Sequence, residues 1–449
     1  MENRNYLDKI IDFVFSKNKV KYLILLFLIA FILRAIAANN LSPNADEMVH
    51  GTHALGIIES KKLQIMDQDA VWFYLTDLFY RIFGENLIGL RFMSILFGSL
   101  SILLVYLISK ELFNKRAALI AAFILTFSSY HIIMSLAEMD TSMMFFILFS
   151  IYFFIKALRE KKNIFYFLSS LFLGISVMVK QIALPFIPAF VLFLIYYKIK
   201  NKEFRINWRA LSYSLIIILI LLIPILTFNY LLYKDKGLVD LQFSRFLGIA
   251  KDTYQSIEAT LTPFSFRDLF LPYENHPAGL YEGISILFSY APLLLILGIL
   301  GIIISYKRNK EFTFLILISF LIPFIFLSGT SLLPIHFVFA VPLLAVFSSN
   351  LLDFIIIKTQ NFRIKTKLVL YLILILILVL SFIKMDNHGI FSGKNEITKV
   401  IKFKNANIQD DSLVLVDSRV YRGRIALAFN DKHYLEASNL DALLKTQDS

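Results

Sequence analysis

Two pairs of carboxylates are the residues of this sequence best suited to chemistry. Asp46 and Glu47 follow the first long apolar stretch, and Glu138 and Asp140 stand at the start of a later one. Charged groups beside apolar stretches are costly to insert into a membrane, so they mark function or partnered structure. Grouped carboxylates serve as a general base or bind a hard divalent cation. The competing interpretation is that they only cap helices, because acidic groups are favoured at helix N-termini.

Three basic residues near the ends of apolar stretches complement these carboxylates. Lys180 stands alone in a short connection, Val179-Lys-Gln-Ile-Ala-Leu-Pro185. Such a lysine holds a phosphate as a point charge, or it merely extends to the membrane interface. Arg34 and Arg91 are candidates for binding a phosphate or for pairing with the carboxylates. Of the two roles, ion pairing is favoured for both arginines.

Other candidate ligands are less specific. Arg267 lies in a long loop and is a candidate contact of a lipid phosphate, with solvated charge as the alternative. His336 is a single histidine without the spacing of a histidine metal site. A divalent cation remains possible, and Asp46, Glu47 and Asp140 would be its ligands.

The composition is that of a membrane protein. Hydrophobic residues make up 58% of the 449 residues and charged residues only 17%, against roughly a quarter charged in soluble domains. The net charge of +12 is explained by basic residues on cytoplasmic loops, so no nucleic-acid partner is predicted. The absence of cysteine excludes disulfides, thiolate catalysis and cysteine metal sites.

The apolar stretches predict an all-α polytopic fold with about eleven transmembrane helices, since a spanning helix needs about 20 mostly apolar residues. The predicted spans cover residues 20–38, 87–109, 117–134, 141–158, 164–179, 182–197, 211–233, 285–306, 312–328, 334–352 and 367–384.

The basic residues orient these spans. Alternate connections carry Lys17, Lys19 and Lys21; Lys110, Lys115 and Arg116; Arg159, Lys161 and Lys162; Lys198, Lys200, Lys202, Arg205 and Arg209; Lys307, Arg308 and Lys310; and Lys358, Arg363, Lys365 and Lys367. By the positive-inside rule this side, with the N-terminus, is cytoplasmic. The carboxylates and Lys180 then share the outer face.

The same orientation places the long segments outside. The first outer loop, 39–86, and the fourth, 234–283, are expected to hold interfacial helices. The chain is therefore divided into a transmembrane domain, 1–384, and a small extracytoplasmic α/β domain, 385–449. In the latter, Ser412-Leu-Val-Leu-Val-Asp417 and His433-Tyr-Leu-Glu436 predict strands, and Val420 to Asn430 predicts a helix.

These features together resemble the GT-C superfamily of membrane glycosyltransferases. The similarity is to the branch of dolichyl-phosphate-mannose protein mannosyltransferases and lipid A aminoarabinose transferases. It runs from about Leu23 to Lys200 and more weakly to Leu352. It rests on Asn44-Ala-Asp-Glu-Met-Val-His50, on Ile82-Phe-Gly84 before Gly89-Leu-Arg-Phe-Met-Ser94, on Glu111-Leu-Phe113, on Ser135-Leu-Ala-Glu-Met-Asp-Thr141 and on Gly174 to Pro185.

The resemblance implies an inverting transfer of a sugar from a polyprenyl-phosphate carrier to a lipid, glycan or protein acceptor at the outer face of the plasma membrane. Asp46 would match the family's catalytic base, aided by Glu47, and Asp140 its second active-site carboxylate. Lys180 would match its phosphate-binding lysine. Glu138, Arg34, Arg91, Arg267 and His336 complete the predicted substrate-binding set.

The sequence departs from the family pattern at two places. Gln68, in Asp67-Gln-Asp-Ala-Val-Trp-Phe-Tyr74, stands where a lysine is expected, and His336-Phe337 replaces an Arg-Tyr pair. These changes put a donor contact and the substrate specificity in doubt. The alternatives are a ligase or polymerase of lipid-linked glycans, a lipid or sugar transporter, and a non-catalytic scaffold. Nearly uncharged span interiors count against transport.

Overall fold

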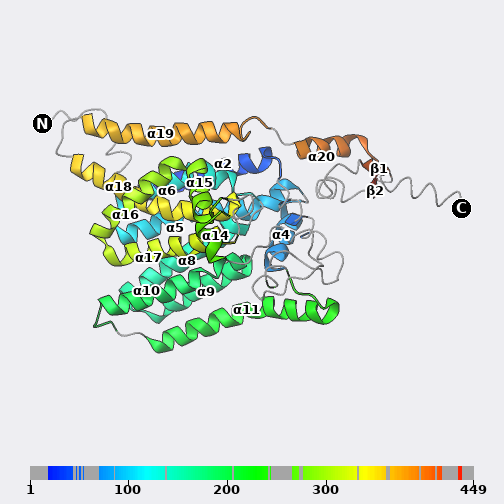
Figure 1. Cartoon of the computed structure of the whole chain (residues 1–449). Helices are drawn as coiled ribbons and strands as arrows, with labels where there is room; N and C mark the ends of the chain where they lie inside the picture. The colour runs from blue at the N-terminus through cyan, green and yellow to red at the C-terminus, as the bar shows by residue number, and fades with distance from the viewer. Residues whose placement is uncertain are drawn as a thin grey trace, which may run out of the picture.

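The computed structural model describes residues 19–43, 47, 50, 51, 54, 70–84, 86–136, 139–204, 207–240, 243, 265–272, 277–330, 333–359, 365–393, 396–409, 412–416 and 433–436. They form an elongated bundle of helices, with α11 along one edge and α19 along the opposite edge (Figure 1). The chain is a multi-pass membrane protein, as predicted.

The helices and strands follow one another in this order: α2 (Lys19–Asn40), α4 (Ala70–Phe83), α5 (Leu87–Leu112), α6 (Lys115–Thr126), α7 (Ser129–Ile133), α8 (Met139–Glu160), α9 (Asn163–Val179), η1 (Gln181–Ala183), α10 (Phe186–Lys200), α11 (Trp208–Lys236), α14 (Phe266–Phe270), α15 (Gly279–Tyr290), α16 (Pro292–Arg308), α17 (Lys310–Ser328), η3 (Pro334–Phe339), α18 (Ala340–Thr359), α19 (Lys365–Asn387), α20 (Glu396–Asn407), β1 (Leu413–Val416) and β2 (His433–Glu436).

Every predicted span coincides with helical structure, but several spans are short or broken. Within the described residues, seven helices are long and apolar enough to cross a membrane, or eight if α15 and α16 count as one span bent by 113°. The stretch 117–134 divides into the 12-residue α6 and the five-residue α7. A hydropathy window averages over such breaks, which accounts for part of the difference from about eleven full-length helices; the unbroken α9 has only 17 residues.

The breaks lie at one end of the bundle, the end predicted to face outward. There α6 gives way to α7, α9 gives way to η1, α15 bends into α16, and η3 precedes α18. Proline begins two of these elements, at Pro292 and Pro334, where its missing N–H costs nothing. Irregular backbone at membrane depth is tolerated where it is buried in protein or lines a cavity.

The opposite end is closed by a buried ion cluster. Asp353 of α18 accepts hydrogen bonds from Arg116 at 2.5 Å, Arg308 at 2.9 Å and Asn114 at 2.7 Å. The Asp353 side chain is fully buried. The cluster ties the start of α6 to the ends of α16 and α18, which fixes the bundle at its predicted cytoplasmic end.

Close backbone approach holds α16 against α18. A methyl group added at Gly301 would lie 2.2 Å from the carbonyl oxygen of Phe347. Because lipid is as apolar as the side chains, helices in a bilayer associate through such close packing at small residues rather than through a hydrophobic driving force.

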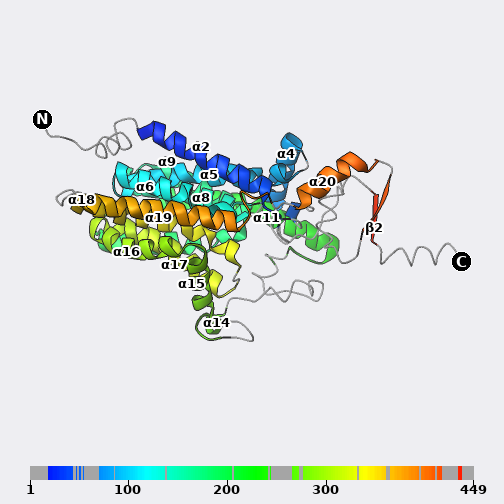
Figure 2. The same cartoon turned by 90° about the horizontal axis from the view of Figure 1, so that it is seen from above.

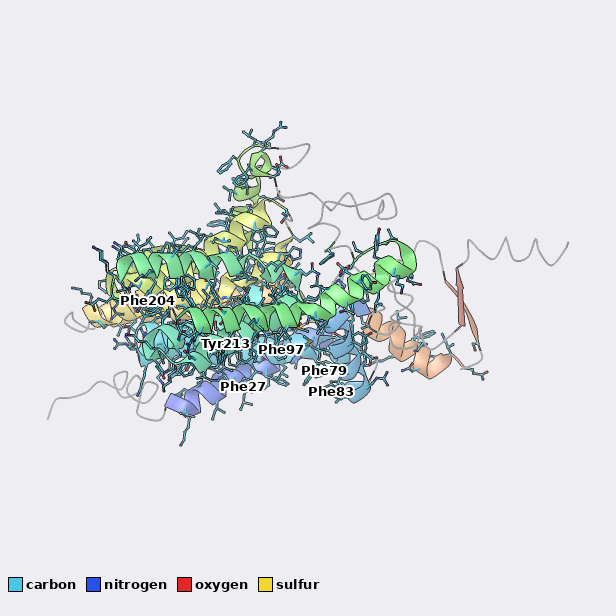
Figure 3. All side chains as sticks on the ribbon, turned by 90° about the horizontal axis from the view of Figure 1, so that it is seen from below. Phe27, Phe79, Phe83, Phe97, Phe204 and Tyr213 are labelled. Atoms are coloured by element: carbon cyan, nitrogen blue, oxygen red, sulfur yellow. The ribbon has the colours of Figure 1, made fainter. Side chains whose placement is uncertain are left out.

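The first outer loop contains the predicted helix, α4, which packs across the start of α5. Phe83 stacks on Phe92 with ring centroids 4.0 Å apart, and Phe79 lies 5.2 Å from the same ring. Figure 3 shows Phe79 and Phe83 together on α4, at one end of the bundle. The fourth outer loop contains the short α14, which stands away from the bundle in Figure 2.

The C-terminal segment contains both predicted strands. β1 and β2 pair in parallel, with Leu413 opposite His433 and Val416 opposite Glu436. The predicted helix Val420 to Asn430 lies outside the described residues, and α20 was not predicted. Figures 1 and 2 both place α20 and the strands at the end of the bundle where α4 lies, so the first outer loop and the tail share one side.

Candidate functional site

Three buried side chains from distant parts of the chain meet at the end of the bundle that is predicted to face outward. Lys180 donates to Asp140 with Nζ to Oδ2 at 2.6 Å. The Nδ1 atom of His336 lies 3.2 Å from Oδ1 of Asp140 and 3.4 Å from Nζ of Lys180. The exposed fractions are 0% for Asp140, 2% for Lys180 and 9% for His336, so the ionic cluster is shielded from water.

The breaks in the helices position these side chains. Asp140 lies in the first turn of α8, where a negative charge is stabilised by the helix dipole. Lys180 ends α9 with extended backbone, and its carbonyl accepts from Ala183 in η1. His336 lies in η3. A straight helix at any of these points would direct the side chain elsewhere.

The imidazole of His336 can bond to only one of its two neighbours through Nδ1 at a time. With Nδ1 unprotonated it accepts from the ammonium of Lys180, and with Nδ1 protonated it donates to Asp140. The cluster is therefore able to hold a proton at Nδ1 and to release Lys180 from one contact when it does so.

Glu47 and Arg91 form a second buried ion pair. The Nε and Nη2 atoms of Arg91 donate to the two oxygens of Glu47, each at 2.8 Å. Its Nη1 donates to the carbonyls of Ala38 at 2.6 Å and Leu41 at 2.8 Å. Both side chains of the ion pair are fully buried. The pair clamps the first outer loop to the end of α2 and the start of α5.

Arg34 is a buried cation in a different setting. Its Nη1 donates to Ala30 at 3.1 Å in the same helix, and its Nη2 lies 2.8 Å from Nδ1 of His131. Its Nε has no hydrogen-bond partner, although the residue is only 1% exposed. Among the residues that the structure describes, no carboxylate pairs with Arg34. A buried cation without a carboxylate partner is costly, so Arg34 is a candidate contact for an anion.

Arg34 and the start of α8 both approach Gly98 of α5. A methyl group at Gly98 of α5 would lie 2.9 Å from Nε of Arg34 and 3.1 Å from Cγ2 of Thr141, the residue after Asp140. The missing side chain of Gly98 thus leaves space between the guanidinium and the start of α8.

The remaining predicted residues divide into two groups. Asp46 and Glu138 lie outside the described residues, and Asp46 directly precedes the clamped Glu47. Arg267 is described, but it is exposed on α14 and does not join the buried cluster.

Sequence analysis missed His131 and Tyr130. His131 holds Arg34, and Tyr130 donates to the carbonyl of Pro334, two residues before His336. A signal was present, because Ser128-Ser-Tyr-His131 interrupts the apolar stretch 117–134 with four polar groups in a row.

The carboxylates described here are poorly suited to a divalent cation. Both oxygens of Glu47 face Arg91, and both oxygens of Asp140 face Lys180 and His336. A cation would have to displace these positive partners. Among the described residues, no group of three or more acidic or histidine side chains forms a candidate metal site.

Both the sequence and the fold of this chain were compared with those of known proteins. Residues 67–228 match the family model described as dolichyl-phosphate-mannose-protein mannosyltransferase. No curated protein matches the chain in sequence.

Solved structures match over nearly the whole chain. ArnT from Cupriavidus metallidurans, bound to undecaprenyl phosphate, is 13% identical with a TM-score of 0.63, covering 93% of this chain and 86% of that one. The oligosaccharyltransferase of Archaeoglobus fulgidus in its apo form is 16% identical with a TM-score of 0.59, covering 94% of this chain and 65% of that one. The same archaeal enzyme, AglB, was also solved with an inhibitory peptide and a dolichol-phosphate.

The chain has a GT-C-like fold, which it shares with ArnT and the archaeal oligosaccharyltransferase, and its segment 67–228 matches the family model described as dolichyl-phosphate-mannose-protein mannosyltransferase.

Proposed function

We propose that this protein is an inverting glycosyltransferase that moves a sugar from a polyprenyl-phosphate carrier to an acceptor at the outer face of the cell membrane. The observation that carries the proposal is the buried Asp140–Lys180–His336 cluster, together with the buried guanidinium of Arg34, which pairs with no carboxylate among the described residues. These charges lie near the ends of helices predicted to span the membrane, which supports a site where a lipid-linked sugar phosphate is presented.

The leaving group accounts for the two cations. When the bond between C1 of the sugar and the phosphate oxygen breaks, negative charge grows on the lipid phosphate while the sugar becomes oxocarbenium-like. Lys180 and Arg34 would neutralise this charge from fixed positions in a site shielded from water, where such electrostatic stabilisation is most effective. Lys180 would have to weaken its ion pair with Asp140 to bind the phosphate, whereas Arg34 has no ion pair with a described carboxylate. Arg34 is therefore a stronger candidate than Lys180 for the first phosphate contact.

Asp46 is assigned as the base. Inversion requires that the acceptor attack the face of the sugar opposite the phosphate, so the base must be supplied from another element than Lys180. The clamp between Glu47 and Arg91 fixes the chain one residue after Asp46. Glu47 itself is then a positioning residue, because its oxygens are bound to Arg91, and Asp140 holds Lys180 in place.

The structural relatives support the class of donor. ArnT was solved with undecaprenyl phosphate and AglB with a dolichol-phosphate, both of which are polyprenyl phosphates. The distribution of basic residues over the loops supports an orientation with the N-terminus cytoplasmic and the C-terminus outside.

The test is a transfer assay with purified protein in nanodiscs. A panel of undecaprenyl- and dolichyl-phosphate sugars is supplied with lipid, glycan and peptide acceptors, and released polyprenyl phosphate is quantified with and without a chelator. We expect release with at least one monophosphate donor, equally in the presence of chelator. Release only from diphosphate-linked oligosaccharides would support a glycan ligase instead, and no release from any donor would contradict the proposal.

A further inference from the structure

A cavity of about 260 Å³ lies between α6 and α7 on one side, the bend between α15 and α16 on a second, and α19 on the third. None of the residues assigned to sugar transfer lines it. Its walls are apolar along α16 and α19, at residues such as Leu297, Ile377 and Leu380, and polar at the end near the bend. The cavity is thus amphipathic, with its polar end at the outer side of the bundle.

Three features give the polar end an affinity for anions. Lys384 of α19 donates to the carbonyl of Ser289 and lies 4.8 Å above the ring of Tyr290. Ser129 lines the cavity, is only 7% exposed and makes no side-chain hydrogen bond within the described residues. The N-terminus of α16 has no side-chain cap, and its first amide-bearing residues, Leu293 and Leu294, also line the cavity. An ammonium, a hydroxyl donor and a helix N-terminus together suit a phosphate.

The apolar part identifies the rest of the ligand. Neighbouring side chains of α16 and α19, such as Ile299 and Val379, are exposed and therefore face lipid. The volume is below that of an ordinary small-molecule pocket, roughly 300–1,000 Å³. It therefore holds a phosphate and the first carbons of its chain, while the remainder of the chain extends into the bilayer.

We propose that this cavity binds the phosphodiester of an anionic membrane phospholipid. A single lysine matches the single negative charge of a phosphodiester better than the two charges of a phosphate monoester, such as the polyprenyl phosphate that remains after sugar transfer. The site does not depend on the proposed transfer reaction, because its residues are separate from the Asp140 cluster.

The site is also connected to that cluster. Tyr290, which lines the cavity, stacks on Tyr130 with ring centroids 4.8 Å apart and planes at 24°. Tyr130 in turn bonds to the carbonyl of Pro334 at the start of η3, which carries His336. A lipid in the cavity therefore supports the segments that position His336 against Asp140.

Native mass spectrometry of the purified full chain tests the proposal, with phosphatidylglycerol as the probe. We expect one retained phosphatidylglycerol on the wild type and at least about tenfold weaker binding for Lys384→Met, the loss of one charged hydrogen-bond donor. Lys358→Met is the matched control, since Lys358 also lies over an aromatic ring, that of Phe354 at 5.9 Å, but at the other end of the bundle. Leu297→Trp, which fills the cavity and leaves every charge in place, should also abolish retention.

Three results would overturn the inference. The first is wild-type retention by both Lys384→Met and Leu297→Trp. The second is equal binding of uncharged diacylglycerol, which would show an apolar site without phosphate recognition. The third is displacement of phosphatidylglycerol from this site by equimolar undecaprenyl phosphate, which would assign the cavity to the monoester.

Discussion

At the residue scale, the proposed base contributes to the rate of transfer, and the proposed phosphate contacts contribute to binding of the donor, so the two can be measured separately. Asp46 has the clearest prediction, because removing a positioned base costs about 10²- to 10⁴-fold in rate while substrate binding persists. We expect Asp46→Asn to lose turnover by this factor and to retain affinity for polyprenyl phosphate. Glu203→Gln is the control, since Glu203 is exposed in a loop on the predicted cytoplasmic side. Unchanged turnover in Asp46→Asn would remove the base assignment.

Lys180 and Asp140 form a double-mutant test of the buried cluster. Lys180→Met leaves the carboxylate of Asp140 buried without its cation, which should cost about 3–5 kcal/mol of stability. The double variant Lys180→Met, Asp140→Asn removes both charges and should recover most of that loss. Thermal unfolding in detergent measures the stability of each variant, and the transfer assay measures its activity.

The two readouts separate structure from catalysis. If Lys180 contacts the donor phosphate, the double variant regains stability but not activity. Recovery of activity along with stability would show that Lys180 only balances the charge of Asp140.

At the element scale, two glycines at helix contacts predict opposite outcomes. In Gly98→Ala the new methyl group meets the flexible side chain of Arg34, so the fold tolerates it while the guanidinium moves. We therefore expect weaker binding of polyprenyl phosphate with little change in unfolding temperature. In Gly301→Ala the methyl group meets the backbone of Phe347, and overpacking of this kind costs about 1–3 kcal/mol.

Lipid-binding and thermal-unfolding measurements on both variants check this pair. A large stability loss in Gly98→Ala, with donor affinity unchanged, would show that Arg34 serves packing alone.

The helices themselves could be predicted from the sequence, but their breaks could not. Hydropathy located α5, α8 and α11 to within a few residues because each is a continuous apolar run. The stretch 285–306 predicted one span, whereas the chain bends by 113° between α15 and α16. Hydropathy averaged over a whole span does not detect a local turn such as the one at Ala291. The candidate site residues Lys180 and His336 lie at breaks of this kind.

At the scale of the whole molecule, the predicted membrane topology indicated which residues lie at the same end of the bundle. It did not indicate which of these residues are in contact. Lys180 and Asp140 were selected because both fall at outer helix ends, and they are in contact at 2.6 Å. Ion pairing was predicted for both Arg34 and Arg91, and Arg91 does pair with Glu47, whereas Arg34 contacts His131 and no described carboxylate. Which partner each arginine meets depends on how its helix is rotated about its axis. That rotation is set by packing across the bundle. The apolar pattern of a single span contains little information about this packing.

The orientation of the molecule is itself testable, since the chain contains no cysteine. Single cysteines are introduced at Asn405 on α20 and at Lys202 in the loop before α11, both of which are exposed. We expect a membrane-impermeant maleimide to label Asn405→Cys in intact cells and Lys202→Cys only after permeabilisation. The reverse pattern would invert the proposed topology and place the site at the cytoplasmic face.

The clamp between Glu47 and Arg91 bears on how the protein is made. Either charge alone in the bilayer costs about 2.5–3.5 kcal/mol on insertion scales, and they belong to segments that leave the ribosome at different times. Arg91 also satisfies two carbonyls at the end of α2, so the first two membrane helices must enter the bilayer as a matched unit. We therefore expect that loss of either partner first affects biogenesis. The nascent chain would be retained at the insertion machinery and degraded.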